Sequence, residues 1–442
     1  MRHRVLMVSD MFHPQVGGVE SHIYVLAQHL MRQGHKVVVL THHYGERQGV
    51  RYLTGGLKVY HLPRVDMYQS CTFPTLFGSF RVFRVVCLRE RITLVHGHGN
   101  FSTLAHESVM HAGTLGLKTV FTDHSLFRFD DVASILTNKL LKFTCSNVHA
   151  VVCVSHTSKE NTVLRACAPP HRVFVIPNAV DSRQFEPDLE AHARWRARHP
   201  GAFTVVVLSR LAYRKGADLL AALVPDVCRR HPHVRFLVGG DGPKKALLER
   251  VVEAHGLRSR VTFAGFVPHE EAAAFLSQGD LFLNVSLTEA FCMAIVEAAS
   301  VGLPVVATAV GGVPEVLPPS MVALAEPERA AVAAALAEAV GRRGAPEVVE
   351  KARWEQHRRV AAMYSWEDVA ARTEKVYDFI QGHQVRDDTL LGRMRRFHQC
   401  GAVAGKLFAC VALVDTWVHR AIAWAQPAEE IDIAPDVPAG SL

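Results

Sequence analysis

Residues 286–317 read SLTEAFCMAIVEAASVGLPVVATAVGGVPEVL, and the prediction of the fold starts from this stretch. Glu289 and Glu297 are separated by a mostly apolar run. A helix that begins near Thr288 would place the two carboxylates about 12 Å apart along its axis and on neighbouring faces. This spacing suits a ligand with hydroxyl groups at both ends and phosphates between them, such as a sugar nucleotide. For a glutamate pair taken alone, the simpler interpretation is an amphipathic helix with two solvated carboxylates.

The composition describes a globular protein with anionic partners. The chain has 442 residues, enough for two domains and a further segment. Apolar residues make up 49% and charged residues 21%, and the net charge is +7. The basic residues show no patch interleaved with aromatic side chains, which disfavours nucleic acid. A diphosphate or an anionic membrane surface fits the charge at least as well.

Cysteine usage and the first residues favour a protein that faces a reducing compartment. Nine cysteines occur without a Cys-x-x-Cys pair, and Cys145, Cys153, Cys228 and Cys292 lie in apolar contexts. They are expected to be buried free thiols. The apolar run in MRHRVLMVSD is too short for a signal peptide. We therefore expect the catalytic body to face the cytosol.

Strand and helix patterns alternate along most of the chain. About six strands alternate with helices up to VFVIPNAVD, and the alternation restarts at FTVVVLSRLAYRKGADLL. This order predicts an α/β chain with two doubly wound parallel sheets. The predicted divisions are a first domain at 1–181, an interdomain connection at 182–202, a second domain at 203–363, a helix crossing back to the first domain at 364–385, and a membrane-associated tail at 386–442.

In the first half, candidate site residues stand where strands end. The loop at Gly17–Gly18 precedes a helix and lets backbone N–H groups approach an anion, although it lacks a dinucleotide fingerprint. One strand ends at His96 and His98, and another at Asp123-His124. Ligands bind at the carboxyl ends of strands in open α/β sheets, so these residues are predicted to line the site. A His-x-His pattern can bind a metal, but no third ligand is suitably spaced in the sequence, and we predict none.

In the second half, Arg210 and Lys215 follow a strand. Two fixed cations at such a loop can hold a diphosphate and neutralise the charge of a leaving phosphate, each charge-assisted bond contributing about 1.5–3 kcal/mol. A glycine turn at Gly240 and Gly242 follows the next strand. No Asp-x-Asp motif provides a metal here, which supports metal-independent chemistry. A pair of surface cations is the alternative for Arg210 and Lys215 taken alone.

The tail combines basic residues with an apolar run. Lys406, Asp415, His419 and Arg420 interrupt that run, and each charge at a bilayer centre costs about 2.5–3.5 kcal/mol. We expect an interfacial helix, or one buried by a partner, in place of an independent membrane span. The final EEIDIAPDVPAGSL is expected to be a loose tail.

The glycine loops, the strand-end histidine, the two cations and the glutamate pair occur in an order that resembles retaining glycosyltransferases of family 4, which have the GT-B fold. Within that family, the wording is similar to the PIG-A-like catalytic subunits of phosphatidylinositol N-acetylglucosaminyltransferase, which start glycosylphosphatidylinositol (GPI) anchor biosynthesis. The segments that carry the resemblance are MVSDMFHPQVGGVESHIYVLAQHL, FTDHSLFRFDD, SKENTVLRA, VIPNAVD, SRLAYRKG and SLTEAFCMAIVEAAS.

The resemblance implies two Rossmann-like domains facing a cleft and transfer of N-acetylglucosamine from UDP-N-acetylglucosamine to phosphatidylinositol, with retention of configuration. It implies a catalytic set of His124, Glu289, Arg210 and Lys215, a donor-binding set of Gly17, Gly18, Arg210, Lys215, Gly240, Gly242, Glu289 and Glu297, and an acceptor-side set of His96, His98 and Asp123. It also implies no cofactor and no metal, because the leaving phosphate takes the proton of the acceptor.

Further partners follow from the same resemblance. They are a membrane and the other subunits of the GPI N-acetylglucosaminyltransferase complex, at the endoplasmic reticulum with the catalytic body on the cytoplasmic side. The family's subunit has a clear span near its C-terminus, and the charge-interrupted tail departs from it. Two rival functions remain: a family 4 transferase with another nucleotide sugar or acceptor, and a non-catalytic scaffold subunit. The presence of every charged site residue disfavours the scaffold.

Overall fold

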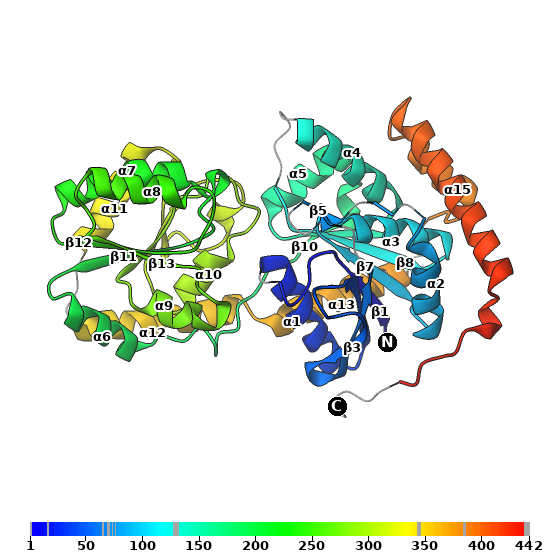
Figure 1. Ribbon diagram of the computed structural model, residues 1–442, viewed down its shortest axis with the longest axis horizontal. Coiled ribbons are helices and arrows are strands. Elements are labelled where there is room, and N and C mark those ends of the chain that lie inside the picture. The colour runs from blue at the N-terminus through cyan, green and yellow to red at the C-terminus, as the bar shows by residue number, and fades with distance from the viewer. Residues whose placement is uncertain are drawn as a thin grey trace. The chain divides into compact units, whose positions relative to one another are not determined.

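The computed structural model describes residues 2–15, 17–63, 66–68, 71–72, 74–75, 77–126, 132–342, 346–382 and 386–436. The chain forms two compact units, one of residues 1–177 together with 366–442 and one of residues 178–365. Each unit is an α/β layer structure around its own sheet (Figure 1). Val16 and residues 127–131, which belong to two of the quoted segments, lie outside the described residues.

The first unit is built on an 8-stranded sheet in the order β10-β9-β8-β7-β1-β2-β4-β3, in which β3 alone is antiparallel to its neighbour. Its strands are β1 Arg4–Val8, β2 Lys36–His42, β3 Gly49–Leu53, β4 Leu57–Leu62, β7 Leu94–His98, β8 Lys118–Asp123, β9 Ala150–Cys153 and β10 Val173–Val175, and β5 Asp66–Tyr68 pairs separately with β6 Cys71–Thr72. Its helices are α1 Gly18–Arg32, α2 Phe80–Arg89, α3 Thr103–Thr114, α4 Val132–Asn147, α5 His156–Ala166, α13 Trp366–Gly382, α14 Leu390–His398 and α15 Ala404–Ala425.

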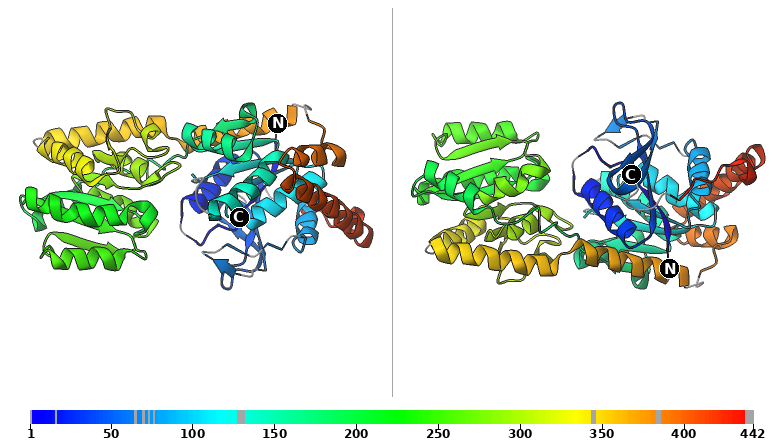
Figure 2. Two further views of the ribbon diagram at one scale, coloured as in Figure 1. Left: turned by 90° about the horizontal axis from the view of Figure 1, so that it is seen from above. Right: turned by 90° about the horizontal axis from the view of Figure 1, so that it is seen from below.

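The second unit has a 6-stranded parallel sheet in the order β13-β12-β11-β14-β15-β16. Its strands are β11 Phe203–Leu208, β12 Val234–Gly239, β13 Val261–Gly265, β14 Leu281–Asn284, β15 Val305–Thr308 and β16 Val322–Ala325. Its helices are α6 Leu189–Arg198, α7 Ala217–Arg230, α8 Lys245–Ala254, α9 Ala272–Ser277, α10 Met293–Ser300, α11 Arg329–Gly341 and α12 Pro346–Met363. The central strands are fully buried because helices cover both faces, as Figure 2 shows.

The predicted connection at 182–202 is wrong, because this segment belongs to the second unit. It contains α6, whose N-terminus is capped by the Asp188 carboxylate accepting from Ala191 N at 2.8 Å. The indole of Trp195 is 6% exposed and donates to Thr204 Oγ1 at 2.9 Å. The scattered basic residues that suggested a linker lie on the solvent side of this helix. The estimate of about six strands in the first half was also too low, because the sheet holds eight.

The helix α13 belongs to the first unit, as the sequence predicts. It packs on α1 and brings the hydroxyl of Tyr377 to 2.8 Å from Nδ1 of His96. The four cysteines that were expected to be buried thiols are buried and free.

The helix α15 is held against the first unit by its own buried carboxylate. Asp415 is 0% exposed and accepts from the ring Nδ1 of His111 at 2.6 Å and from the hydroxyl of Thr114 on α3. Val418 and Ile422 pack against the core of the unit. Among the described residues, α15 is the helix whose length and apolar content would allow it to cross a membrane, a property that some helices of soluble proteins share.

The segment after α15 is not loose as far as Asp436. Ala434 is buried and its N–H donates to the Arg89 carbonyl at 2.9 Å. Asp436 pairs with Arg4 at 2.7 Å and with Lys36 at 2.9 Å. The expectation of a loose tail is therefore wrong for residues 427–436, because two apolar side chains and one carboxylate dock on the first sheet's edge; residues 437–442 lie outside the described part of the chain.

Candidate functional site

The second unit gathers charged side chains at the carboxyl end of β11 and β14. Lys215 lies in the loop between β11 and α7, and its Nζ is 2.6 Å from Oε1 of Glu289. The same oxygen accepts from Ser286 Oγ at 2.8 Å. Burial lowers the pKa of Lys215, but the attraction of Glu289 outweighs it, so the net pKa is raised and the ammonium stays charged. The loop therefore presents a fixed cation held by a neighbouring carboxylate.

Arg210 lies five positions before Lys215 in the same loop and is exposed. No described side chain pairs with its guanidinium. Its side chain can therefore reach an anionic ligand without first breaking an ion pair within the described part of the chain, whereas Lys215 must share its ammonium with Glu289.

Glu297 lies on α10, and its side chain is 13% exposed. Among the described residues, none donates a hydrogen bond to its carboxylate. Burial alone raises the pKa of Glu297 to about 7. Nδ1 of His269 is 4.0 Å from Oε1 of Glu297, but burial lowers the pKa of His269, so this ring does not provide a compensating charge near neutral pH. A half-ionised buried carboxylate is suited to accept hydroxyl groups from a ligand.

The helix between the two glutamates begins at Met293 and not near Thr288, which corrects the prediction. Neighbouring loops hold the intervening backbone: Leu287 N donates to the Arg214 carbonyl at 2.9 Å, and Gly312 N donates to the Glu289 carbonyl at 2.9 Å. These bonds compete with helix formation, so Glu289 is placed by a loop and Glu297 by a helix. The axial spacing of about 12 Å does not apply.

Three glycines let the loops at this edge approach one another closely. Gly216 has φ +74°, and a Cβ there would lie 1.7 Å from the Val285 carbonyl oxygen. A Cβ on Gly240 would lie 1.9 Å from the Ser209 oxygen, and one on Gly242 would lie 2.4 Å from the Leu211 oxygen. Gly240 and Gly242 therefore have a structural role that the sequence analysis did not assign: they press the β12–α8 loop against the loop that carries Arg210 and Lys215.

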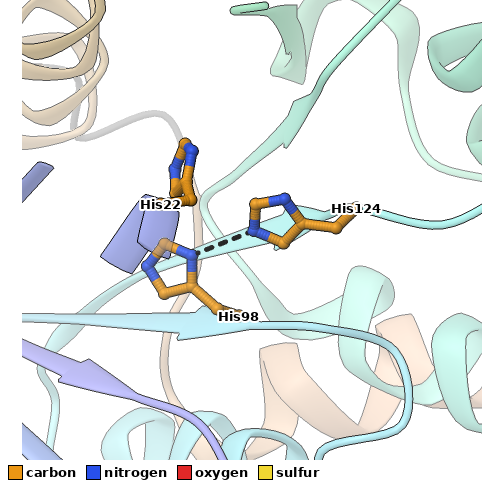
Figure 3. Close-up of side chains that lie close together, drawn as sticks. All are labelled: His22, His98 and His124. Carbon is orange, nitrogen blue, oxygen red and sulfur yellow. Dashed lines mark hydrogen bonds between the residues drawn. The ribbon is translucent and has the colours of Figure 1, made fainter. Parts of the chain in front are cut away.

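In the first unit, His22, His98 and His124 come together at the carboxyl ends of β7 and β8 (Figure 3). Nδ1 of His98 is 3.3 Å from Nε2 of His124. The ring of His22, from the first turns of α1, meets that of His124 edge-on at 4.8 Å. We call these three residues the histidine cluster. Within it, His124 is the more accessible ring, since His98 is 0% and His22 is 5% exposed.

The strand-end histidines are neutral. Burial lowers the pKa of His96 to about 3, with a further contribution from His22. Burial and the neighbouring rings hold the pKa of His98 and of His124 well below the usual value. His124 can therefore accept or donate a hydrogen bond near pH 7, but it does not carry a positive charge.

Two predicted acceptor-side residues are in the interior. His96 is 1% exposed, and its ring nitrogens contact Tyr377 at 2.8 Å and Thr122 at 2.7 Å. Asp123 is 0% exposed and accepts from Asn100, Ser125 and Thr162. Neither side chain faces a ligand in this structure, so their assignment to acceptor contact is corrected: both hold neighbouring loops in place.

The glycine loop before α1 already holds an anion from the chain. Gly17 is the extended N-cap of α1, and Glu20 accepts hydrogen bonds from its own and from Val19's backbone N–H. A Cβ on Gly17 would lie 2.4 Å from the Glu20 carboxylate, whereas nothing lies within 4 Å of one on Gly18. A phosphate at this helix end would have to displace Glu20.

The histidine cluster is also the group of described residues that could hold a metal ion, with ligand nitrogens within 4.8 Å of one another. The sequence reasoning missed His22, because it lies on a different element far from His98 in sequence. Its position on the first turns of the helix after the glycine loop was the available signal. Metal-bound imidazoles usually donate their other N–H to an acceptor, and no described residue accepts from Nε2 of His98. The surroundings therefore fit a metal poorly.

Comparisons with known proteins identify the family. The model for PIGA (GPI anchor biosynthesis) matches residues 42–131, and the model for glycosyl transferases group 1 matches residues 191–359. The chain is 52% identical to the corresponding subunit of phosphatidylinositol N-acetylglucosaminyltransferase from Arabidopsis thaliana, over 98% of this chain and 94% of that protein. The chain belongs to the PIGA family. Its human relative of the same name is 48% identical over 98% of this chain and 88% of its own length.

A solved structure supports the fold of this PIGA-family chain. Sucrose-phosphate synthase from Thermosynechococcus elongatus matches with a TM-score of 0.72 at 22% identity, covering 86% of this chain and 100% of that one. The lipopolysaccharide glycosyltransferase WaaG matches with a TM-score of 0.64 at 16% identity, covering 86% of this chain and 100% of that one. At such identities the likeness concerns the fold alone. The chain has the GT-B fold, with two Rossmann-like parallel-sheet domains and one apolar C-terminal helix.

Proposed function

We propose that this chain is the sugar-transferring subunit of a phosphatidylinositol N-acetylglucosaminyltransferase. It moves N-acetylglucosamine from UDP-N-acetylglucosamine to phosphatidylinositol, the first step of GPI anchor biosynthesis. The observation that carries this function is the identity of 43–52% over nearly the whole chain to relatives that are named for this activity. The charged cluster in the second unit gives that activity a chemical basis.

For the donor, we propose that Arg210 and Lys215 bind the diphosphate. Both cations are fixed in one loop, and Lys215 is charged because of Glu289. As the bond between the sugar and the phosphate breaks, negative charge accumulates on the leaving UDP, and two nearby cations lower the energy of that state. Glu297 is proposed to accept the ribose hydroxyl groups, and Glu289 the hydroxyl groups of the sugar.

For the acceptor, we propose that neutral His124 donates or accepts a hydrogen bond at the reacting sugar. A charged imidazolium would repel the positive charge that develops at the sugar carbon, so the low pKa of His124 suits this role. The acceptor hydroxyl attacks that carbon, the bond to the phosphate oxygen breaks, and the leaving phosphate takes the hydroxyl proton. This route requires no metal and no protein base.

The finer partners are also proposals. A protein that is one subunit of a transferase implies further subunits, and α15 together with the lipid acceptor favours work at a membrane. We propose the endoplasmic reticulum membrane, with both sheet domains on the cytoplasmic side. The absence of Cys-x-x-Cys pairs and the free state of the described cysteines are consistent with a reducing compartment.

The test is transfer of labelled N-acetylglucosamine from UDP-N-acetylglucosamine to phosphatidylinositol, by membranes that contain the full chain and the subunits that accompany it. Arg210→Ala should lower transfer roughly a hundredfold, because it removes a charge that faces the leaving group. Arg258→Ala is the matched control, since this arginine is 75% exposed and pairs only with Glu253 among the described residues. Equal activity of both variants would contradict the assigned diphosphate contact, and transfer to another lipid would contradict the acceptor.

A further inference from the structure

The first unit contains an apolar groove between α3, α4 and the start of α15. It has a volume of about 900 Å³, at the upper end of the range of about 300–1,000 Å³ for ligand pockets. Its walls are formed by Met110 of α3, Leu140 and Phe143 of α4, and Leu407 and Phe408 of α15. Phe143 and Phe408 meet edge-on at 4.9 Å, which fixes the wall between α4 and α15. We call this space the apolar groove.

One end of the apolar groove adjoins the histidine cluster. Thr103 and His106, which line that end, lie on the first turn of α3, directly after the loop that leaves His98. His106 Nε2 contacts the Asn100 carbonyl at 3.0 Å, so the groove end and the loop are tied together. The ring of His106 is also bonded to Thr144 at 2.6 Å, and burial lowers its pKa to about 4. It therefore places no charge in the groove.

The other end opens beside the exposed face of α15. Val403 is 83% and Leu407 is 61% exposed, and Trp417 and Trp424 lie further along the same helix at 61% and 86%. Exposed tryptophans on an apolar helix are typical of a membrane interface. Figures 1 and 2 show α15 along the outer edge of the first unit, away from the central strands. The groove thus connects a membrane-type surface with the strand ends that carry His98 and His124.

A cation stands at the rim. Lys139 of α4 lines the groove and is exposed. The other charged lining residue, Glu107, is directed to Thr75 at 2.6 Å and Ser79 at 3.1 Å. An apolar space with a lysine at its mouth complements a molecule that has a hydrocarbon chain and a phosphate.

We propose that the apolar groove binds one acyl chain of the phospholipid acceptor, which rests on the proposed function. A headgroup that leaves the bilayer surface to reach the histidine cluster draws its first CH₂ groups out of the hydrocarbon. Each CH₂ exposed to water weakens binding about fourfold. The groove keeps these groups covered, and Lys139 neutralises the phosphate as the headgroup rises. An apolar segment of a partner protein is the alternative occupant, but it does not account for the lysine or for the connection to His98.

The test is photo-crosslinking of the full chain, within its membrane complex, by phosphatidylinositol that carries a diazirine at the end of one acyl chain. Adducts are expected within residues 103–110, 139–143 and 400–411. Leu407→Asp should reduce them about tenfold, because it places a carboxylate in the groove. Val414→Asp is the matched control: Val414 is an exposed apolar residue of the same helix, at 44%, that does not line the groove. Excess unlabelled phosphatidylinositol should compete in the wild type.

Three outcomes overturn the proposal: adducts on the outer face of α15 alone, equal losses in both variants, or adducts to another subunit that unlabelled lipid does not displace. Sugar transfer is measured in the same membranes. If adducts form in the groove but no transfer to phosphatidylinositol occurs, the groove stands as a lipid site and the proposed function fails. If transfer occurs and the adducts lie elsewhere, the groove fails and the function stands.

Discussion

Glu297→Gln tests the electrostatics of the donor site. Burial raises the pKa of Glu297 from 4.5 to about 7. Between these pH values the folded chain retains a proton that the unfolded chain has released. The stability of the wild type should therefore fall as the pH rises from about 4.5 through about 7, and level off above. A difference of 2.5 pKa units, 7 minus 4.5, corresponds to about 3 kcal/mol at about 1.36 kcal/mol per unit.

Glutamine does not titrate, so Glu297→Gln should abolish this part of the pH dependence and stabilise the free chain at pH 8. For the unit of residues 178–365, about 3 kcal/mol corresponds to a Tm about 6–12 °C higher. The assay is thermal unfolding of the detergent-solubilised chain between pH 5 and 8.5. Glu249→Gln is the control, because Glu249 is exposed on α8 of the same unit.

Donor affinity should change in the opposite direction. If the ionised carboxylate accepts ribose hydroxyl groups, the wild type should bind UDP-N-acetylglucosamine about tenfold more weakly for each pH unit below about 7. Glu297→Gln should bind more weakly at pH 8, with no such dependence. A variant that is no more stable than wild type at pH 8, and whose affinity changes with pH as the wild type's does, would refute the buried, functional carboxylate.

Three further predictions concern separate features. Gly216→Ala should lose donor binding and several-fold more stability than the about 1–2 kcal/mol expected for a left-handed residue, since its Cβ would lie 1.7 Å from the Val285 oxygen; Gly256→Ala, also left-handed with nothing within 4 Å, is the control in thermal unfolding, and equal losses would contradict the steric argument. Asp415→Ala should release α15 from the first unit and cost about 3–5 kcal/mol, because His111 loses its carboxylate, and limited proteolysis within α15 should accelerate; unchanged cleavage would contradict the anchor. Excess EDTA should leave sugar transfer unchanged, and a loss restored by one added divalent ion would contradict metal independence.

The sequence predicted the second unit's donor site well because its signals are local. Arg210 and Lys215 lie in one loop, and the carboxyl ends of parallel strands must share one edge of the sheet. Glu289 was placed at the right edge but on the wrong element, since hydrogen bonds to Arg214 and Gly312 from other loops prevent the helix from starting early. Loop-to-loop bonds of this kind leave no periodic signal.

The first unit's site was predicted less well. His96 and His98 have similar sequence surroundings, but His96 points to Tyr377 from α13 and is enclosed, whereas His98 meets His124. His22 was not foreseen, because it joins the cluster only when α1 packs beside β7 and β8. Alternation along a strand places successive side chains on opposite faces, but it does not reveal which face a distant helix covers.

The amino-acid sequence was enough to indicate the two α/β domains, the family and the residues that can hold a diphosphate, because these depend on short-range periodicity and on residue types at strand ends. Tertiary contacts were needed to show that Asp123 and His96 are interior supports, that Asp415 turns an interrupted apolar run into a helix docked on α3, and that a groove connects this helix with the histidine cluster. Each of these results requires contacts between segments far apart in the chain, and burial in such contacts fixes both the direction of a side chain and its charge.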